Sequence, residues 1–280
     1  MVKITPAEFK VLSKYILEIS GIVLESGKEY LIETRLNILL EELKYSSYSE
    51  LYHNAKNDPK KDIEKKIVDA ISTNETYFFR DTAPFELLQY KIMPDIIDKK
   101  LTLNRGKYPI AIRIWSAACS TGQELYSIAI VLKEMLRDLK LYNITLMGTD
   151  ISNAAISQAS YARYNKFEVT RGLSPLLLKK YFNQEGEYWR IKDEIRAMAA
   201  FKKMNLLEPF IGLGKFDIIF FRNVAIYFSP QERTKLYDKI SKVVEPEGYL
   251  IIGATESLTN DTTLFTPKKY VKSIFYQLKR

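Results

Sequence analysis

The sequence is poor in the residues that most often build metal sites and activated nucleophiles. Its 280 residues contain one cysteine, Cys119, and one histidine, His53. A single cysteine cannot close a disulfide within the chain, which is typical of a protein kept in the reducing cytoplasm. One histidine and one cysteine leave no cluster with zinc-ligand spacing and no Ser-His or Cys-His pair. We therefore expect a cytoplasmic protein that binds no metal.

Long apolar runs are absent as well, and this excludes a membrane-spanning helix. The first residues, MVKITPAEFKVLSKY, contain no apolar core of a signal peptide. The net charge is +8, yet residues 1–70 carry 11 Lys and Arg against 12 Asp and Glu, so the excess lies in the remainder. Either an acidic partner or a generally lysine-rich composition explains it. No zinc-finger spacing or aromatic-basic pattern is present, and we expect no nucleic-acid partner.

The chain shows two different patterns of apolar residues. Residues 1–75 show apolar residues at helical spacing and no strand pattern, which predicts an all-helical N-terminal domain. From Ile110 the chain alternates short apolar runs with amphipathic helices, the pattern of an α/β sheet, and we expect the second domain to span residues 76–280. A segment at about 168–201 fits neither scheme and predicts a small inserted subdomain with its own strands. The expected strands are IAIRIWSA, ITLMGTD, FDIIFFRN, GYLIIGA and SIFYQLK.

The loop after the first of these strands, SAACSTGQE, consists almost entirely of small side chains. Ligands of open α/β sheets bind at the carboxyl ends of the strands, and small side chains let a ligand approach the backbone. The loop has one glycine, Gly122, and no following Gly-Lys-Ser/Thr, so it is neither a G-x-G-x-x-G fingerprint nor a phosphate loop. A carboxylate, Glu124, follows instead and favours a cationic or hydroxyl-bearing ligand.

The next strand ends in a second acid, Asp150, in the sequence GTD. An acid at this place accepts hydrogen bonds from a ribose in dinucleotide-binding folds. Two acids without a phosphate clamp favour a positively charged nucleoside, and S-adenosylmethionine has this chemistry. The alternative is that Asp150 only caps the next helix.

Five motifs now occur in one order: TNETYFFRD, SAACSTGQELYSIA, GTDIS, FFRNVAIYF and GYLIIGATESL. Together they resemble the chemotaxis-receptor methyltransferases, the CheR family, over nearly the whole chain. The resemblance implies a Rossmann-like class I methyltransferase domain: a mostly parallel seven-stranded sheet with an antiparallel last strand. It also implies an all-α N-terminal domain and a small inserted β-subdomain.

The resemblance further implies a set of site residues. Arg80 and Tyr227 are expected to be catalytic, and Arg80 also to contact the cofactor. Glu124 is expected to hold the amino end of the methionine moiety, Asp150 the ribose hydroxyls, and Asn205 and Leu206 the adenine. The cofactor-binding set is completed by Asn74, Thr76, Arg222 and Asn223. Five of these residues have a plainer interpretation: Asn74 and Thr76 cap a helix, Arg80 forms a surface ion pair with Asp81, and Arg222 and Asn223 shape a turn.

The implied reaction moves a methyl group from S-adenosyl-L-methionine to glutamate side chains on the cytoplasmic helical region of chemoreceptors, and leaves S-adenosyl-L-homocysteine. A glutamate with a pKa of about 4.3 is already ionised at neutral pH, so no general base is needed and the missing histidine is explained. Contact with the membrane is expected only through the receptor.

Two features depart from the family pattern. The family's Gly-Glu-Glu-Pro reads Gly122-Gln123-Glu124-Leu125 here, which retains the second acid. The segment YFNQEGEYWRIK is shorter than in members whose subdomain binds a peptide at the receptor C-terminus, and this counts against such a tether. Two other functions remain open: a catalytically silent module that binds S-adenosylmethionine or a nucleotide, and a methyltransferase acting on a protein outside chemotaxis.

Overall fold

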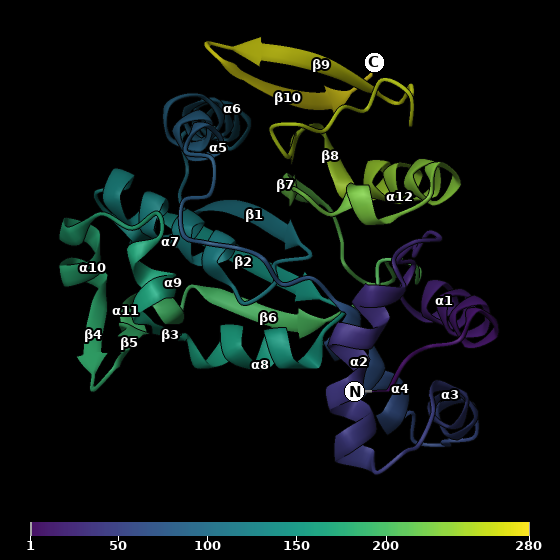
Figure 1. The fold of residues 1–280 in the computed structure, drawn as a ribbon. Helices are drawn as coiled ribbons and strands as arrows, with labels where there is room; N and C mark the ends of the chain where they lie inside the picture. Colours follow the sequence, from purple (N-terminus) through teal and green to yellow (C-terminus); the bar gives the residue numbers. More distant parts are fainter. Residues whose placement is uncertain (1, 280) are drawn as a thin grey trace.

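The computed structural model describes residues 2–279 as a bundle of four helices beside a seven-stranded sheet (Figure 1). The bundle comprises α1 (Pro6–Ser20), α2 (Glu29–Leu43), α3 (Tyr48–Lys56) and α4 (Asp62–Ile71). Helix α1 begins with a capping box: the Thr5 side chain accepts from the amide of Glu8, and the Glu8 carboxylate accepts from the amide of Thr5. Apolar residues at helical spacing, such as Leu12, Ile16 and Leu36, form a core of their own.

The remaining elements belong to the sheet, its covering helices and a second small sheet. The helical elements are α5 (Ala83–Leu87), a π-helical turn (Leu88–Ile92), α6 (Met93–Leu103), α7 (Gln123–Met135), a 3₁₀ turn (Leu139–Leu141), α8 (Asn153–Tyr161), α9 (Lys166–Thr170), α10 (Pro175–Tyr181), α11 (Asp193–Arg196), a 3₁₀ turn (Ala225–Tyr227) and α12 (Pro230–Val243). The strands are β1 (Ile110–Ala117), β2 (Tyr142–Asp150), β3 (Arg163–Asn165), β4 (Phe182–Glu185), β5 (Tyr188–Ile191), β6 (Ala199–Lys203), β7 (Phe216–Phe221), β8 (Val244–Ile252), β9 (Phe265–Tyr270) and β10 (Ser273–Leu278).

The strand order of the large sheet is β6-β2-β1-β7-β8-β10-β9. Strands β6, β2, β1, β7 and β8 are parallel, and β10 runs antiparallel to both of its neighbours. This arrangement confirms the expected Rossmann-like sheet. The chain runs outward from β1 to β6 and then returns to pair β7 with β1, so the order reverses between these two strands. Open α/β sheets bind their ligands at such a reversal.

Side chains of the central strands alternate between two apolar cores, as the pleat requires. On β1, Ile112 and Ile114 face the core under α5–α7, whereas Trp115 and Ala117 face the core under α12. All four are almost fully buried. Because both faces are covered, the strand reads as a nearly continuous apolar run in the sequence.

The segment between β2 and β7 divides between two sheets. Strands β3, β5 and β4 form a separate three-stranded antiparallel sheet, and β3 lies before residue 168. Strand β6 pairs with β2 in the large sheet. In Figure 1 the arrowheads of β1, β2 and β6 point toward the helical bundle, so the carboxyl ends of these strands and the bundle face each other.

Candidate functional site

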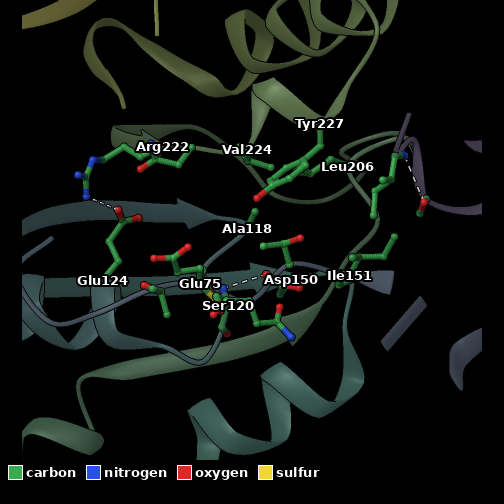
Figure 2. A pocket seen from close by; sticks show the side chains of 18 of the residues that line it. Glu75, Ala118, Ser120, Glu124, Asp150, Ile151, Leu206, Arg222, Val224 and Tyr227 are labelled. Carbon is green, nitrogen blue, oxygen red and sulfur yellow. Dashed lines mark hydrogen bonds and ion pairs between the residues drawn. The ribbon is translucent and has the colours of Figure 1, made fainter. Parts of the chain in front are cut away.

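A pocket lies at the carboxyl ends of β1, β2, β6 and β7, at the reversal of strand order (Figure 2). All ten residues expected at the site line this one pocket: Asn74, Thr76, Arg80, Glu124, Asp150, Asn205, Leu206, Arg222, Asn223 and Tyr227. They come from five separate stretches of the sequence. The topology of the sheet therefore brings together residues that the sequence spreads over more than half of the chain.

The loop after β1 forms the floor of the pocket through an unusual backbone. Ala118, Ser120 and Gly122 have φ angles of 59°, 51° and 93°, so every second residue is left-handed. A Cβ atom at Gly122 would lie 2.9 Å from the Cβ atom of Ala159, and glycine is required there. Left-handed alanine and serine each cost about 1–3 kcal/mol, a cost that proteins retain mainly at functional sites.

Asp150, at the end of β2, is held by the backbone. Its Oδ2 accepts from the amide of Ser120 at 2.8 Å, and its Oδ1 accepts from the amide of Ser152 at 2.9 Å. Burial raises the pKa of the Asp150 carboxyl above its ordinary value, and the hydrogen bonds oppose this only in part. The interpretation of Asp150 as the cap of the next helix is wrong, because the Ser152 side chain caps α8 by accepting from the amide of Ala155.

Glu124, in the first turn of α7, is held by side chains. Its Oε1 accepts from the Ser116 hydroxyl at 2.7 Å, and its Oε2 pairs with Arg222 Nη1 at 2.8 Å. Arg222 is almost fully buried and also pairs with Asp81 at 2.9 Å. Because Asp81 pairs with Arg222, the interpretation of an Arg80–Asp81 ion pair is wrong. The interpretation that Arg222 only shapes a turn is also wrong, because its guanidinium binds two carboxylates. One arginine between two carboxylates leaves one formal negative charge, which suits a cationic ligand.

The segment TNETYFFRD runs along the pocket between α4 and α5 without forming a helix. The carbonyl of Asn74 accepts from the Ser120 hydroxyl at 3.1 Å, and the helix-capping interpretation of Asn74 and Thr76 is wrong. Arg80 donates to the carbonyl of Glu75 at 2.9 Å. The Glu75 side chain lines the pocket and pairs with Arg171 at 3.0 Å. Sequence reasoning missed Glu75, although it lies within the quoted motif.

Residues of the helical bundle and its linker form another wall of the pocket. Ser20, the last residue of α1, and Ile22, two residues beyond it, line the pocket. Asn205 uses its amide group to join the two parts of the chain: Nδ2 donates to the carbonyl of Ile19 at 2.9 Å, and Oδ1 accepts from the amide of Leu207 at 3.0 Å. Helical periodicity reaches the end of α1 but carries no sign of a ligand, so the sequence could not reveal Ser20 and Ile22.

The loop after β7 closes the pocket. Asn223 is left-handed, with φ at 57°, and its amide donates to Glu256 Oε2 at 2.7 Å. Tyr227 lies in the following 3₁₀ turn, and its carbonyl accepts from the amide of Val23 at 3.0 Å. In Figure 2 the Tyr227 hydroxyl points into the pocket toward Ala118, between the Glu124 side and the Asp150 side.

The side chains of the pocket fit S-adenosylmethionine. Figure 2 shows Glu124 and Asp150 on opposite sides of the loop after β1, so one ligand can meet a carboxylate at each end. A cation suits the first carboxylate and a pair of hydroxyls the second, while the loop carries no lysine for a phosphate. Among residues 2–279, no group of three or more His, Cys, Asp or Glu side chains could hold a metal ion. Every described helix is too short or too polar to cross a bilayer.

Comparisons with known proteins agree with this geometry. A family model described as "CheR methyltransferase, SAM binding domain" matches residues 74–274, and one described as "CheR methyltransferase, all-alpha domain" matches residues 7–72. The chain is 37% identical over 278 residues to chemotaxis protein methyltransferase 1 of Pseudomonas aeruginosa, with 98% of each chain covered. It is 36% identical to chemotaxis protein methyltransferase Cher2 of Pseudomonas putida, covering 97% of this chain and 98% of that protein. The chemotaxis protein methyltransferase of Borreliella burgdorferi is 35% identical, with 97% and 96% covered.

Proposed function

The chain belongs to the CheR methyltransferase family, and on this premise we propose that it transfers a methyl group from S-adenosyl-L-methionine to glutamate side chains of chemotaxis receptors. The observation that carries the proposal is the single pocket in which Glu124, Asp150, Arg80 and Tyr227 meet at the carboxyl ends of the parallel strands. Because the receptor glutamates lie in the cytoplasmic helical region, we also propose that the protein acts in the cytoplasm.

The two acids divide the binding of the methyl donor between them in this proposal. Glu124 binds the amino group of the methionine moiety, and Arg222 and Ser116 hold the Glu124 carboxylate in place. Asp150 accepts hydrogen bonds from the ribose hydroxyls, and two backbone amides hold its carboxylate in place for this role. Leu206 packs against the adenine, and Asn205 supports this wall through its contact with Ile19. Asn74, Thr76 and Asn223 complete the lining.

The methyl transfer depends on the alignment of the two reactants more than on general acid or base catalysis. S-adenosylmethionine supplies a methyl group activated by a sulfonium, and the acceptor glutamate is already ionised at neutral pH. In well-oriented reactions, alignment of the reactants can lower the barrier by about 7–11 kcal/mol. We propose that Arg80 orients the incoming carboxylate through a forked contact, and that Tyr227 donates a hydrogen bond or packs its ring beside the methyl group. Among the described residues, the Arg80 guanidinium donates one hydrogen bond, to the carbonyl of Glu75, and lies over the Tyr77 ring, so most of its N–H donors remain free.

A labelling experiment tests the proposal. The protein is incubated with methyl-labelled S-adenosylmethionine and purified cytoplasmic fragments of chemoreceptors, and the labelled fragments are then treated with base. Glutamyl methyl esters release labelled methanol under these conditions, and this is the expected result. Label that resists base would mean methylation of an amine or another group. Binding of the donor without any transfer would favour a silent signalling module.

A further inference from the structure

Helix α4 of the bundle reaches the cofactor pocket through a side chain that does not line it. Asp69, on α4, accepts through its Oδ1 from the Ser152 hydroxyl at 2.8 Å and from the amide of Ala154 at 3.3 Å. Ser152 in turn donates its amide to Asp150 Oδ1 at 2.9 Å. Three consecutive polar groups therefore join the helical bundle to the acid at the end of β2.

The middle and the pocket end of this series of hydrogen bonds are buried. Ser152 is fully buried and Asp150 is 7% exposed. The Ser152 hydroxyl donates to Asp69 while it accepts from the amide of Ala155 at 3.1 Å, so one residue both caps α8 and binds the bundle. Loss of the Asp69 carboxylate would leave a buried hydroxyl and the Ala154 amide without this acceptor. The Ser152 backbone, and with it the Asp150 carboxylate, would then lose part of what fixes its position.

We infer that Asp69 is a positioning residue for Asp150, through which the helical bundle sets the affinity of the pocket for S-adenosylmethionine. The inference rests on the proposed contact between Asp150 and the ribose. Because coupling between sites is reciprocal, a partner that moves α4 changes the affinity for the cofactor, and a bound cofactor holds α4 against α8. The bundle is then part of the cofactor site in addition to any surface it offers to a receptor.

Calorimetric titration with S-adenosylhomocysteine tests this inference on the full chain. Asp69→Ala should raise the Kd about tenfold, because the buried chain of hydrogen bonds is broken. Asp69→Asn retains an oxygen acceptor in the same place and should bind nearly as the wild type does. Asp69→Glu retains the charge but displaces the oxygens, and should bind more weakly than Asp69→Asn. Asp62→Asn, which removes an exposed carboxylate on the same helix, is the matched control and should leave the Kd unchanged.

The pattern among the variants separates positioning from other roles. Unfolding temperatures of the unliganded variants are measured in parallel, because a purely structural role lowers stability and leaves the Kd unchanged. That result for Asp69→Ala overturns the inference. If Asp69→Ala does not fold, the order of Asp69→Asn and Asp69→Glu still decides it: weaker binding by Asp69→Asn would show that charge, and not position, matters.

A double-mutant cycle ties the effect to Asp150. In an Asp150→Ala background, Asp69→Ala should have no further effect on the Kd, because the residue through which it acts is missing. An undiminished effect in that background overturns the inference. The cycle also separates the two proposals: wild-type affinity of Asp150→Ala removes the proposed role of Asp150 itself. Weak binding by Asp150→Ala with normal binding by Asp69→Ala removes only the positioning role of Asp69.

Discussion

The two ends of the pocket hold their acids by opposite means. At the end formed by β1 and β7, Glu124 lies in a network of side chains with Arg222, Asp81 and Ser116. At the end formed by β2, Asp150 accepts from two backbone amides, and no cation among residues 2–279 pairs with it. The first acid is compensated by a buried positive charge, whereas the second is fixed by dipoles alone.

This difference predicts that the two acids respond to different perturbations. A network of charges holds its geometry strongly, but it fails as a whole when one member is removed, because a buried charge then lacks its partner. A carboxylate held by amides retains its geometry without a counter-charge, at the cost of a pKa raised by burial. The Glu124 end is therefore expected to depend on every member of its network, and the Asp150 end on pH. Four experiments test this contrast.

The largest effect is expected from Arg222→Ala. The substitution leaves Glu124 and Asp81 without their shared cation, and loss of one partner of a buried pair costs about 3–5 kcal/mol. The free energy of unfolding, measured by urea denaturation, should fall by this amount, and binding of S-adenosylhomocysteine should weaken. Lys242→Ala removes an exposed pair with Asp238 and is the control, with an expected loss below about 1 kcal/mol. Equal losses in the two variants would contradict the network.

A second large effect is expected from Arg80→Ala, on catalysis. If Arg80 orients the acceptor carboxylate, its loss should lower methyl transfer about a hundredfold, since small misplacements of reactants have effects of this size. Stability should change little, because among the described residues the Arg80 guanidinium donates one hydrogen bond, to a backbone carbonyl, and otherwise only lies over the Tyr77 ring. Initial rates with labelled donor and receptor fragments measure the effect. Wild-type turnover would remove Arg80 from the mechanism.

An intermediate effect is expected from pH. If Asp150 accepts hydrogen bonds from the ribose hydroxyls as a carboxylate, its protonation should weaken the binding of S-adenosylhomocysteine. Burial raises the pKa of Asp150, so affinity should be full above that pKa and should fall as the pH drops through it, with a midpoint above the ordinary value of 3.8. Below the midpoint the affinity falls about tenfold per pH unit. Asp150→Asn should flatten this acid limb and Glu124→Gln should retain it; an unchanged limb in Asp150→Asn would assign the titration to another group.

The smallest effect is expected from Tyr227→Phe. The substitution keeps the ring between the two ends of the pocket and removes only a hydroxyl, so the Kd for S-adenosylhomocysteine should stay near the wild-type value. Methyl transfer should slow about fivefold, the effect of one ordinary hydrogen bond. Calorimetry and initial rates separate the two quantities. Unchanged rates would leave Tyr227 with a packing role, and a large rise in Kd would place it in cofactor binding instead.

Much of the fold could be predicted from the sequence because its strands are buried on both faces. IAIRIWSA corresponds to β1 residue for residue, and SIFYQLK to β10 within one residue. Two strands of the large sheet, β6 and β9, were not predicted. Both lie at its edges, where a strand lacks the continuous apolar run of a strand buried on both faces. β6, with the sequence AAFKK, has no fully buried side chain, and β9 contains Pro267 and two exposed lysines, as unpaired edges often do. The domain boundary near residue 75 and the limits of the inserted subdomain at about 168–201 stay predictions.

The sequence assigned ten residues to one site, and the structure places them around one pocket, while their roles stay predictions. Sequence spacing does not reveal that Asp81 pairs with Arg222, or that Ser152 and not Asp150 caps α8. Such pairings depend on side-chain directions across elements distant in the chain. The contribution of the bundle was missed for a further reason. Asp69 lies on the polar face of a helix, where an acid is ordinary, and only the position of α8 gives it a partner.

A crystal structure of the chain with S-adenosylhomocysteine bound tests the central claim most directly. The account predicts that both ribose hydroxyls lie within hydrogen-bond distance of the Asp150 carboxylate, and that the amino group of the homocysteine moiety lies beside Glu124. A ligand bound in the reverse direction, or in a different cavity, would contradict it.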